Sequence, residues 1–463
     1  MIHLNGTGHD PCSPWAVAWG KDYKSHHERI YHHAITKFIA HEQRLLLRAF
    51  MMAYCVLKKH SLENILCRLI SSPDTLASES MKCGNFKLND LFEWHRACPL
   101  FTMGGSVEKK VTGAAMCDAI SIFFIAMTAL IIAYPLARKY SLVDKPGGRK
   151  QHSGNIPLVG GISLYCGIVI FHFLQPDIAP FTNSNLTAYI AAISILLAVG
   201  IADDYYDLPV MTRILAQASA VIVIILDDVY LNTFGFVLGE YELSLGPAGY
   251  LITLLAGWAA INAFNMIDGI DGLLGSVSAV IFAALMVKFM SAGAKQPAMW
   301  CLLMIVALLP YLVSNFGLAG AKVFMGDAGS MVIGFTMLWL ILNASQGNQA
   351  VMAPVTALWI LALPLMDMVN VMIRRLRRRQ SPFHADRDHL HHILLRCGLT
   401  SRQTLLVMVL LTATLAGMGL TLEKFAATES VSIALYLAVF GIYVLMNNAL
   451  QQRHPDPRAL AVR

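Results

Sequence analysis

Among the carboxylates of the chain, two pairs that follow long apolar runs stand out. Asp203 and Asp204 are adjacent, while Asp268 and Asp271 are each followed by a glycine. Adjacent carboxylates repel one another unless a cation lies between them, and magnesium takes oxygen ligands and often bridges to substrate phosphates. If the second segment is helical, Asp268 and Asp271 share one face. Both pairs therefore indicate a site for a hard cation and a phosphate.

A third acidic position, Asp327, lies in a Gly-Asp-Ala-Gly-Ser motif that opens another apolar run. Alone, it suits a metal ligand or a helix cap, and amides at such a helix start can meet a phosphate. Asn265 precedes the second carboxylate pair, and Gly269 and Gly272 permit a tight turn and a close backbone approach to a ligand. Polar residues so close to an apolar run are costly and usually functional.

Cationic and imidazole side chains gather later, where Arg387 precedes His389, His391 and His392. Histidines beside arginine suit a polyanion such as a diphosphate through charge-assisted hydrogen bonds. A zinc site is the alternative, because imidazole also suits that metal. The oxygen-rich character of the aspartate segments favours phosphate recognition.

A basic, glycine-rich turn near the start of the apolar region is a weaker signal. Lys145 and Arg149 lie in the stretch Asp-Lys-Pro-Gly-Gly-Arg-Lys-Gln-His, and a Gly-Gly pair follows it. This composition suits an anion site, but the pattern alone is not specific. The nine cysteines include no Cys-X-X-Cys pair, which argues against a zinc knuckle or a disulfide framework.

The elements that must position these residues are apolar and long. The chain is 56% hydrophobic and 14% charged, whereas soluble domains carry about 25% charged residues. A spanning helix needs about 20 apolar residues, and it must satisfy its own backbone in lipid. We predict an all-α polytopic membrane protein with about 11 transmembrane helices, near 117–136, 158–174, 186–202, 211–226, 248–264, 273–290, 297–314, 329–344, 351–373, 403–421 and 430–449.

Positive charge sets the orientation of these helices. The odd-numbered loops and the C-terminal tail hold 18 lysines and arginines, whereas the even-numbered loops and nearby helix ends hold 3. Because cytoplasmic loops carry the excess of Lys and Arg, we predict that the odd loops are cytoplasmic. All the motifs above fall on odd loops, so the active site is predicted to face the cytoplasm.

The domain organisation follows from the same charges. Residues 1–113 hold 14 lysines and arginines and no spanning run. We interpret them as an N-terminal extension, either poorly ordered or the product of a mis-annotated start before Met103 or Met116. A small accessory domain is the alternative, whereas a signal peptide does not fit. Residues 114–452 form the predicted membrane domain, and 453–463 form a cytoplasmic tail.

Taken together, the five polar segments resemble the polyprenyl-phosphate N-acetylhexosamine-1-phosphate transferase family, known as glycosyltransferase family 4. The resemblance covers about 117–450 with every motif in family order, including Asp-Asp, Asn-X-X-Asp-Gly-X-Asp-Gly, Gly-Asp-X-Gly-Ser and His-X-His-His. The Ser-Pro-Phe segment before the histidines looks like the bacterial subgroup that transfers N-acetylglucosamine 1-phosphate to undecaprenyl phosphate. It looks less like the translocase for the peptidoglycan muramyl-pentapeptide precursor.

The resemblance implies a reaction in which undecaprenyl phosphate and a UDP-N-acetylhexosamine give the lipid diphospho-sugar and UMP. It implies a magnesium ion, for which manganese can substitute, a place in the bacterial inner membrane, and the first membrane step of O-antigen or other surface polysaccharide synthesis. The lipid bilayer and the two substrates are the expected partners, with no nucleic acid. The sequence leaves open which hexosamine is used and whether the enzyme forms a homodimer.

The resemblance also implies a role for each motif position. Asp327 would bind magnesium, with Asp203 and Asp204 near the metal or the lipid phosphate and one of them a candidate base. The expected metal or nucleotide partners are Asp268 and Asp271. The expected substrate-binding residues are His389, His391, His392, Arg387 and Asn265, with Lys145 and Arg149 as weaker candidates.

Two other classes of protein compete with this interpretation. A membrane prenyltransferase would share the DDxxD spacing of Asp203, Asp204 and Asp207, but it leaves the Gly-Asp-Ala-Gly-Ser and His-X-His-His motifs unexplained. A metal or anion transporter would place its polar residues near the bilayer midplane, often in repeated halves. Here the polar residues cluster in loops on one side, and we find no internal repeat.

Overall fold

The computed structural model describes residues 107–145, 154–176, 178, 180–181, 186–347, 350–379, 381 and 389–455. The predicted N-terminal extension, 1–113, lies outside these residues except for 107–113, which belong to the first helix. The boundary at 113, the two interpretations of the extension and most of the predicted tail therefore stay predictions. Arg149 and Arg387 also lie outside the described residues.

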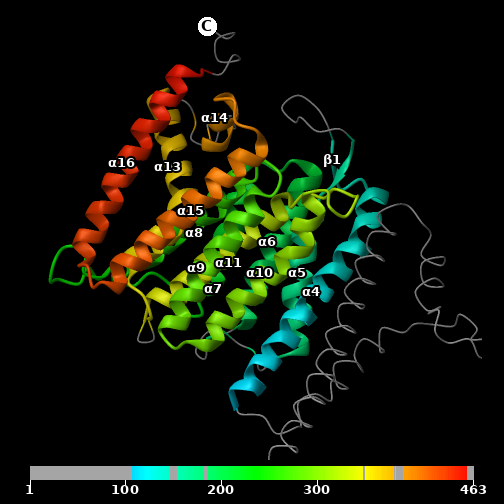
Figure 1. The fold of residues 1–463 in the computed structure, drawn as a ribbon, viewed down its shortest axis with the longest axis horizontal. Coiled ribbons are helices and arrows are strands. Elements are labelled where there is room, and N and C mark those ends of the chain that lie inside the picture. The colour runs from blue at the N-terminus through cyan, green and yellow to red at the C-terminus, as the bar shows by residue number, and fades with distance from the viewer. Residues whose placement is uncertain are drawn as a thin grey trace, which may run out of the picture. The chain divides into compact units, whose positions relative to one another are not determined.

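The described chain is almost entirely helical, as predicted (Figure 1). Each of the eleven apolar runs contains a helix, and the only named strands form a hairpin in the first loop. The elements are α4 (Val107–Lys139), β1 (Val143–Asp144), β2 (Ile156–Pro157), α5 (Gly160–Leu174), α6 (Leu186–Tyr206), α7 (Val210–Ile225), α8 (Ala248–Ile267), α9 (Leu273–Ser291), α10 (Lys295–Asn315), α11 (Gly326–Ser345), α12 (Pro354–Ile360), α13 (Ala362–Arg377), α14 (Leu390–Arg396), α15 (Ser401–Lys424) and α16 (Glu429–Arg453).

The structure supports a smaller number of full spans than eleven. Among the described residues, eight helices are long and apolar enough to cross a membrane, and a ninth span forms if α12 and α13 count together. The other two apolar helices, α5 and α7, have only 15 and 16 residues. At 1.5 Å per residue they rise about 23 Å, less than the roughly 30 Å of a hydrocarbon core. The predicted count of eleven is therefore not confirmed.

The bend between α12 and α13 has a local cause. The two helices meet at Leu361 at an angle of 79°. Pro364 lacks the N–H that would bond to the carbonyl of Ile360, and its ring crowds that carbonyl. A continuous helix through this point is therefore disfavoured. Because of the bend, α13 and its polar residues run in a different direction from α12.

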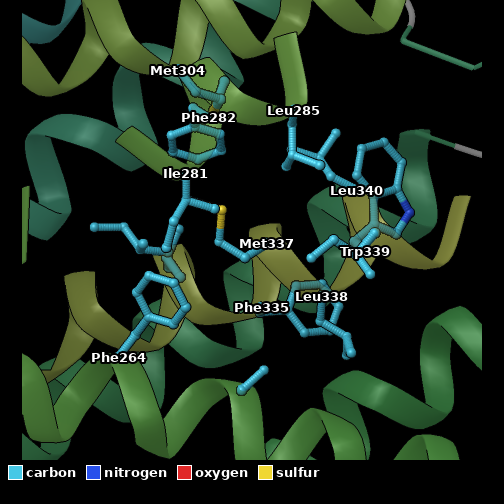
Figure 2. Close-up of a cluster of buried hydrophobic side chains, with 14 of the residues drawn as sticks. Phe264, Ile281, Phe282, Leu285, Met304, Phe335, Met337, Leu338, Trp339 and Leu340 are labelled. Atoms are coloured by element: carbon cyan, nitrogen blue, oxygen red, sulfur yellow. The ribbon is translucent and has the colours of Figure 1, made fainter. Parts of the chain in front are cut away.

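Helix α11 forms the centre of the helical region. Within its apolar stretch 94% of the residues are buried, against 11% for α16, whose apolar surface is left for lipid. Figure 2 shows Met337 of α11 directed toward Ile281 of α9. The rings of Phe335 and Trp339, on the other side of α11, stack against Tyr189 of α6. Because α11 also packs against α5, α6 and α8, its N-terminus is fixed by several helices.

Close backbone contacts hold that N-terminus. A Cβ added to Gly200 of α6 would overlap the backbone of Ala328, and one added to Gly161 of α5 would overlap the backbone of Gly329. The β1–β2 hairpin joins the same region, because the backbone of Phe324 bonds to Pro157 and Gly160. These glycines therefore allow α5, α6 and α11 to meet closely beside Asp327.

Candidate active site

The aspartate site, defined here as Asp203, Asp204, Asp268 and Asp327, lies where α6 and α8 end and α11 begins. Asp204 faces the start of α11, and its carboxylate accepts hydrogen bonds from the amides of Asp327 at 2.9 Å and Ala328 at 3.4 Å. A carboxylate at this position accepts hydrogen bonds from amides that lack partners within the helix, and it interacts favourably with the positive end of the helix dipole. The expectation that these amides are free for a phosphate is wrong, because Asp204 occupies them.

Asp203, although adjacent, faces other partners. Its side chain is 1% exposed, and its oxygens accept hydrogen bonds from the Leu208 amide at 2.8 Å and from Arg213 at 3.1 Å. The charge of Asp327 also acts on this carboxyl group. Neighbouring carboxylates favour a proton or a cation between them, so this pair suits a site for positive charge.

Asp327 is held in place by Asn265, which comes from the last turn of α8. The Asn265 amide donates to the Asp327 carboxylate at 2.6 Å and to the Ser330 hydroxyl at 2.9 Å. Two motifs far apart in sequence therefore meet here, the Asn-X-X-Asp-Gly motif through Asn265 and the Gly-Asp-X-Gly-Ser motif through Ser330. In this arrangement Asn265 orients Asp327, and its predicted contact with substrate stays a prediction.

The segment after Asn265 is a turn and not a helix. Helix α8 ends at Ile267, so Asp268 and Asp271 do not share a helical face. Gly272 takes a positive φ of 76°, as expected for a tight turn, and its amide donates to the Asn315 side chain at 2.5 Å. Asp271 pairs with Lys322 at 2.6 Å on the solvent-exposed side.

Asp268 has an unusual electrostatic environment. Solvent reaches its side chain, yet protein surrounds it on most sides, and the charges of Asp327 and Asp271 act on it. Burial of the charged form, followed by repulsion from Asp327 and Asp271, raises the pKa of Asp268 to about 7. The group is therefore poised to lose its proton when a cation binds nearby.

The donor set of the aspartate site fits a hard divalent cation in chemistry, because its oxygens belong to carboxylates. Within the described residues, no group of three or more His, Cys, Asp or Glu side chains is arranged around a common metal position. The reason lies in the contacts above, since Asp204 caps α11 and Asp203 pairs with Arg213. The metal-ligand roles of Asp203, Asp204 and Asp327 stay predictions.

The histidine arm, defined here as His389, His391 and His392, begins α14. His389 is 5% exposed, and its Nδ1 lies 2.8 Å from the carboxylate of Asp367 in α13. The rings of His389 and His391 lie nearly parallel with centroids 5.9 Å apart, and His392 lies 4.2 Å from His391. Thus the three histidines are adjacent but do not form one metal-binding group.

His391 connects the histidine arm to the aspartate site. A Cβ added to Gly269 would overlap its Nε2, so the ring lies directly against the turn that carries Asp268. The side chain is 1% exposed, and neither ring nitrogen has a hydrogen-bond partner in the described part of the chain. Burial, then the charges of its neighbours, lowers the pKa of His391 to about 3. A buried imidazole without partners is costly unless a ligand supplies one.

The remaining predicted residues lie apart from these contacts. Lys145 is exposed at the end of β1 and is joined to the site only through the hairpin that reaches Phe324. Arg149 and Arg387 lie outside the described residues. The structure therefore brings the aspartates, Asn265 and the histidines together and leaves the three basic candidates as predictions.

Sequence reasoning missed three residues that contact the predicted ones. Arg213 and Lys322 pair with Asp203 and Asp271, and Asp367 pairs with His389. Asp367 could have been found from the sequence. It is spaced with Asn370 and Arg374 as on one face of a helix, and polar residues in an apolar run are usually functional. A single Arg or Lys beside a spanning helix carries no such signal, since topology explains it equally well.

A family model covers the part of the chain that carries the aspartate site. The family model described as glycosyl transferase family 4 matches residues 186–345. This region contains Asp203, Asp204, Asp268 and Asp327, while the histidine arm lies beyond it.

Relatives named undecaprenyl-phosphate alpha-N-acetylglucosaminyl 1-phosphate transferase extend the similarity. The Escherichia coli K12 relative is 46% identical over 330 residues, which cover 70% of this chain and 89% of the relative. The Salmonella typhimurium relative is 47% identical over 71% of this chain and 90% of its own length, and the Haemophilus influenzae relative is 44% identical over 70% and 91%. With such identity over most of their length, the chain belongs to glycosyl transferase family 4.

Proposed function

We infer that this multi-pass membrane enzyme transfers N-acetylglucosamine 1-phosphate to undecaprenyl phosphate. The printed name of its relatives at 44–47% identity states this activity. The observation that carries the inference is the meeting of the motifs, since Asn265 bonds to Asp327 and His391 lies against Gly269. The translocase alternative is not favoured, and family membership leaves the prenyltransferase and the transporter without support.

The donor we propose is UDP-N-acetylglucosamine, with UMP as the second product. In this reaction the lipid phosphate attacks the phosphorus that bears the sugar, and the bond to UMP breaks. A phosphate oxygen is already ionised near neutral pH, so a strong base is not required. Negative charge grows on the oxygens of the donor diphosphate, and cations and hydrogen-bond donors are the usual stabilisers of such transfer.

The family is in general dependent on divalent metals, and magnesium is the ion we propose here. Asp327 would hold it, helped by Asp203 or Asp268, and the metal would supply positive charge to the reacting phosphates. Two features support this role: the repulsion between the Asp203 and Asp327 carboxyl groups, and the raised pKa of Asp268. Asp204 would hold the start of α11 and thereby set the direction of Asp327.

The histidine arm is the proposed diphosphate-binding part of the site. The ring nitrogens of His391 lie beside the Asp268 turn and have no hydrogen-bond partner among the described residues, which supports this role. Arg387 is proposed to act with it. We also propose that the motif loops face the cytoplasm of a bacterial inner membrane, in line with the excess of Lys and Arg on those loops. Cytoplasmic nucleotide sugars would then have direct access to the site.

An assay in membranes tests this function. Undecaprenyl phosphate would be mixed with labelled UDP-N-acetylglucosamine, UDP-N-acetylgalactosamine or UDP-glucose, with and without magnesium. We expect UMP and a lipid-linked sugar from the first donor, only when magnesium is present. Release of pyrophosphate from a prenyl diphosphate, without turnover of any UDP-sugar, would support the prenyltransferase instead.

A further inference from the structure

A buried polar group outside the family motifs joins α13, α14 and α16. Its centre is Asp367, which is 3% exposed within an apolar part of α13. Three donors converge on its two oxygens: His389 Nδ1 at 2.8 Å, the Leu390 amide at 2.9 Å and the Tyr443 hydroxyl at 2.9 Å. A buried carboxylate is tolerated when its hydrogen bonds are this complete.

The contact with Asp367 determines which nitrogen of His389 carries hydrogen. An ionised carboxylate accepts hydrogen bonds and donates none, so Nδ1 of His389 must carry the proton that it shares with Asp367. The other nitrogen, Nε2, is then the one left for a further partner. Buried carboxylates fix the ring orientation of functional histidines in this manner in other enzymes.

The same carboxylate sets where α14 begins. The Leu390 amide, at the first residue of α14, bonds to Asp367, and His389 precedes it directly. His391 follows in the same turn, with its ring nearly parallel to that of His389 and packed against Gly269. A displacement of Asp367 would therefore move His391 relative to the turn of Asp268.

Tyr443 brings the last helix into this arrangement. Most of α16 has an apolar surface for lipid, yet Tyr443 is 5% exposed and Asn447, one turn later, is fully buried. The Tyr443 hydroxyl donates to the Asp367 oxygen that also accepts from Leu390. Helix α16 thus supplies a polar contact to the histidine arm although it carries none of the family motifs.

We propose that Asp367 and Tyr443 are positioning residues, which hold His389 and the start of α14 so that the histidine arm meets the diphosphate of the nucleotide sugar. The proposal rests on the proposed function, since it assumes that this arm binds the donor. It predicts that loss of either residue impairs use of the UDP-sugar and spares use of undecaprenyl phosphate.

The first test is the isosteric variant Asp367→Asn, because it keeps the side-chain shape while it places an amide beside His389. We expect kcat/KM for UDP-N-acetylglucosamine to fall about 10- to 100-fold, as misplaced groups typically cost. The KM for undecaprenyl phosphate and the melting temperature should stay close to those of the wild type. Tyr443→Phe removes one hydrogen bond and should lower kcat/KM about three- to tenfold.

Matched controls separate positioning from general packing. Tyr436 lies seven residues earlier on the same helix and packs its ring edge-on against Trp359, so Tyr436→Phe should leave kcat/KM unchanged. The double variant Asp367→Asn/His389→Asn should be within about twofold of His389→Asn alone, because residues that act through one another are not additive. Multiplied effects in the double variant, or equal effects of the two tyrosine variants, would overturn the proposal.

UMP release by the wild type shows whether the proposed function fails or only the positioning proposal fails. If the wild type releases no UMP from any UDP-sugar, the proposed function fails. The double variant and His389→Asn are then compared by the affinity for UDP-N-acetylglucosamine, measured by thermal shift. If the wild type is active while Asp367→Asn loses melting temperature but keeps its kcat/KM for the UDP-sugar, the role of Asp367 is only structural and the positioning proposal fails alone.

Discussion

The aspartate site and the histidine arm satisfy their polar groups in different ways. In the aspartate site, solvent reaches Asp268, and the negative charges of Asp203 and Asp327 act on one another. In the histidine arm, His389 is buried and its Nδ1 has a partner in Asp367. The first region thus gathers negative charge that suits a cation, whereas the second pairs His389 within the protein.

This difference assigns the two regions different tasks. Carboxylates that repel one another gain from a metal and from the phosphates that come with it, so the aspartate site is suited to bind and to release ligands. A buried hydrogen-bonded arm is suited to hold a ligand in one geometry, because its side chains need no rearrangement. The contact of His391 with Gly269 is where the two regions meet.

The largest expected effect is that of Asp327→Asn. The variant removes a negative charge that acts on Asp203, Asp204 and Asp268, while its amide keeps the size of the side chain. We expect turnover to fall at least about 10³-fold, in the range seen when a preorganised electrostatic group is lost. Membrane insertion should be unchanged, as measured by extraction and melting temperature. The control is Asp228→Asn, because Asp228 is exposed and follows the C-terminal end of α7, whereas Asp203 and Asp204 precede its N-terminal end. Substantial activity of Asp327→Asn would exclude a metal-ligand role.

Gly269→Ala tests whether the two regions must touch. The new methyl group would overlap His391 and push the histidine arm away from Asp268. We expect kcat/KM for the nucleotide sugar to fall about 10- to 100-fold, because small displacements of positioned groups have effects of this size. Gly417→Ala is the control, since a Cβ at that helical position meets open space. Equal activity of the two variants would show that the contact has no part in the reaction.

The raised pKa of Asp268 predicts how magnesium affinity depends on pH. Below about 7 this carboxyl group is protonated, so a cation must displace a proton to bind. The magnesium concentration for half-maximal activity should therefore rise as the pH falls, by up to about tenfold per pH unit. Asp268→Asn should flatten this dependence between pH 6 and 8, and an unchanged slope in that variant would assign the proton to another group.

Lys322→Gln should have the smallest effect of these changes. Lys322 pairs with Asp271 at the exposed edge of the aspartate site, and both side chains are partly solvated. Exposed ion pairs contribute little, so we expect turnover to change by about two- to fivefold. The measurement is kcat/KM at low and high salt, where screening should bring the variant and the wild type together. A loss as large as that of Asp327→Asn would place Lys322 among the essential groups.

Several features of the protein were predictable from the sequence because they depend on local patterns. Long apolar runs predicted the helices, and each of the eleven runs contains one. The motif order predicted the family, which the relatives confirm. The Gly-X-Asp-Gly segment predicted a tight turn, and Gly272 has the positive φ that such a turn requires.

Other features required the tertiary structure, because they depend on contacts between residues far apart in the chain. Adjacent Asp203 and Asp204 look alike in sequence, yet one pairs with Arg213 and the other caps α11. Helices α5 and α7 are apolar like the spans around them, but with 15 and 16 residues they are shorter than the helices that can cross a membrane.

The histidine motif shows the same division between sequence and structure. Residue types alone predicted anion-binding histidines, since imidazole and arginine suit a diphosphate. Only the folded chain brings His391 to Gly269, pairs His389 with Asp367, 22 residues away in the sequence, and adds Tyr443, 76 residues from Asp367, to the same carboxylate. The physical reason is that burial and hydrogen-bond partners are set by neighbours in space, and helix packing, rather than local sequence, chooses those neighbours.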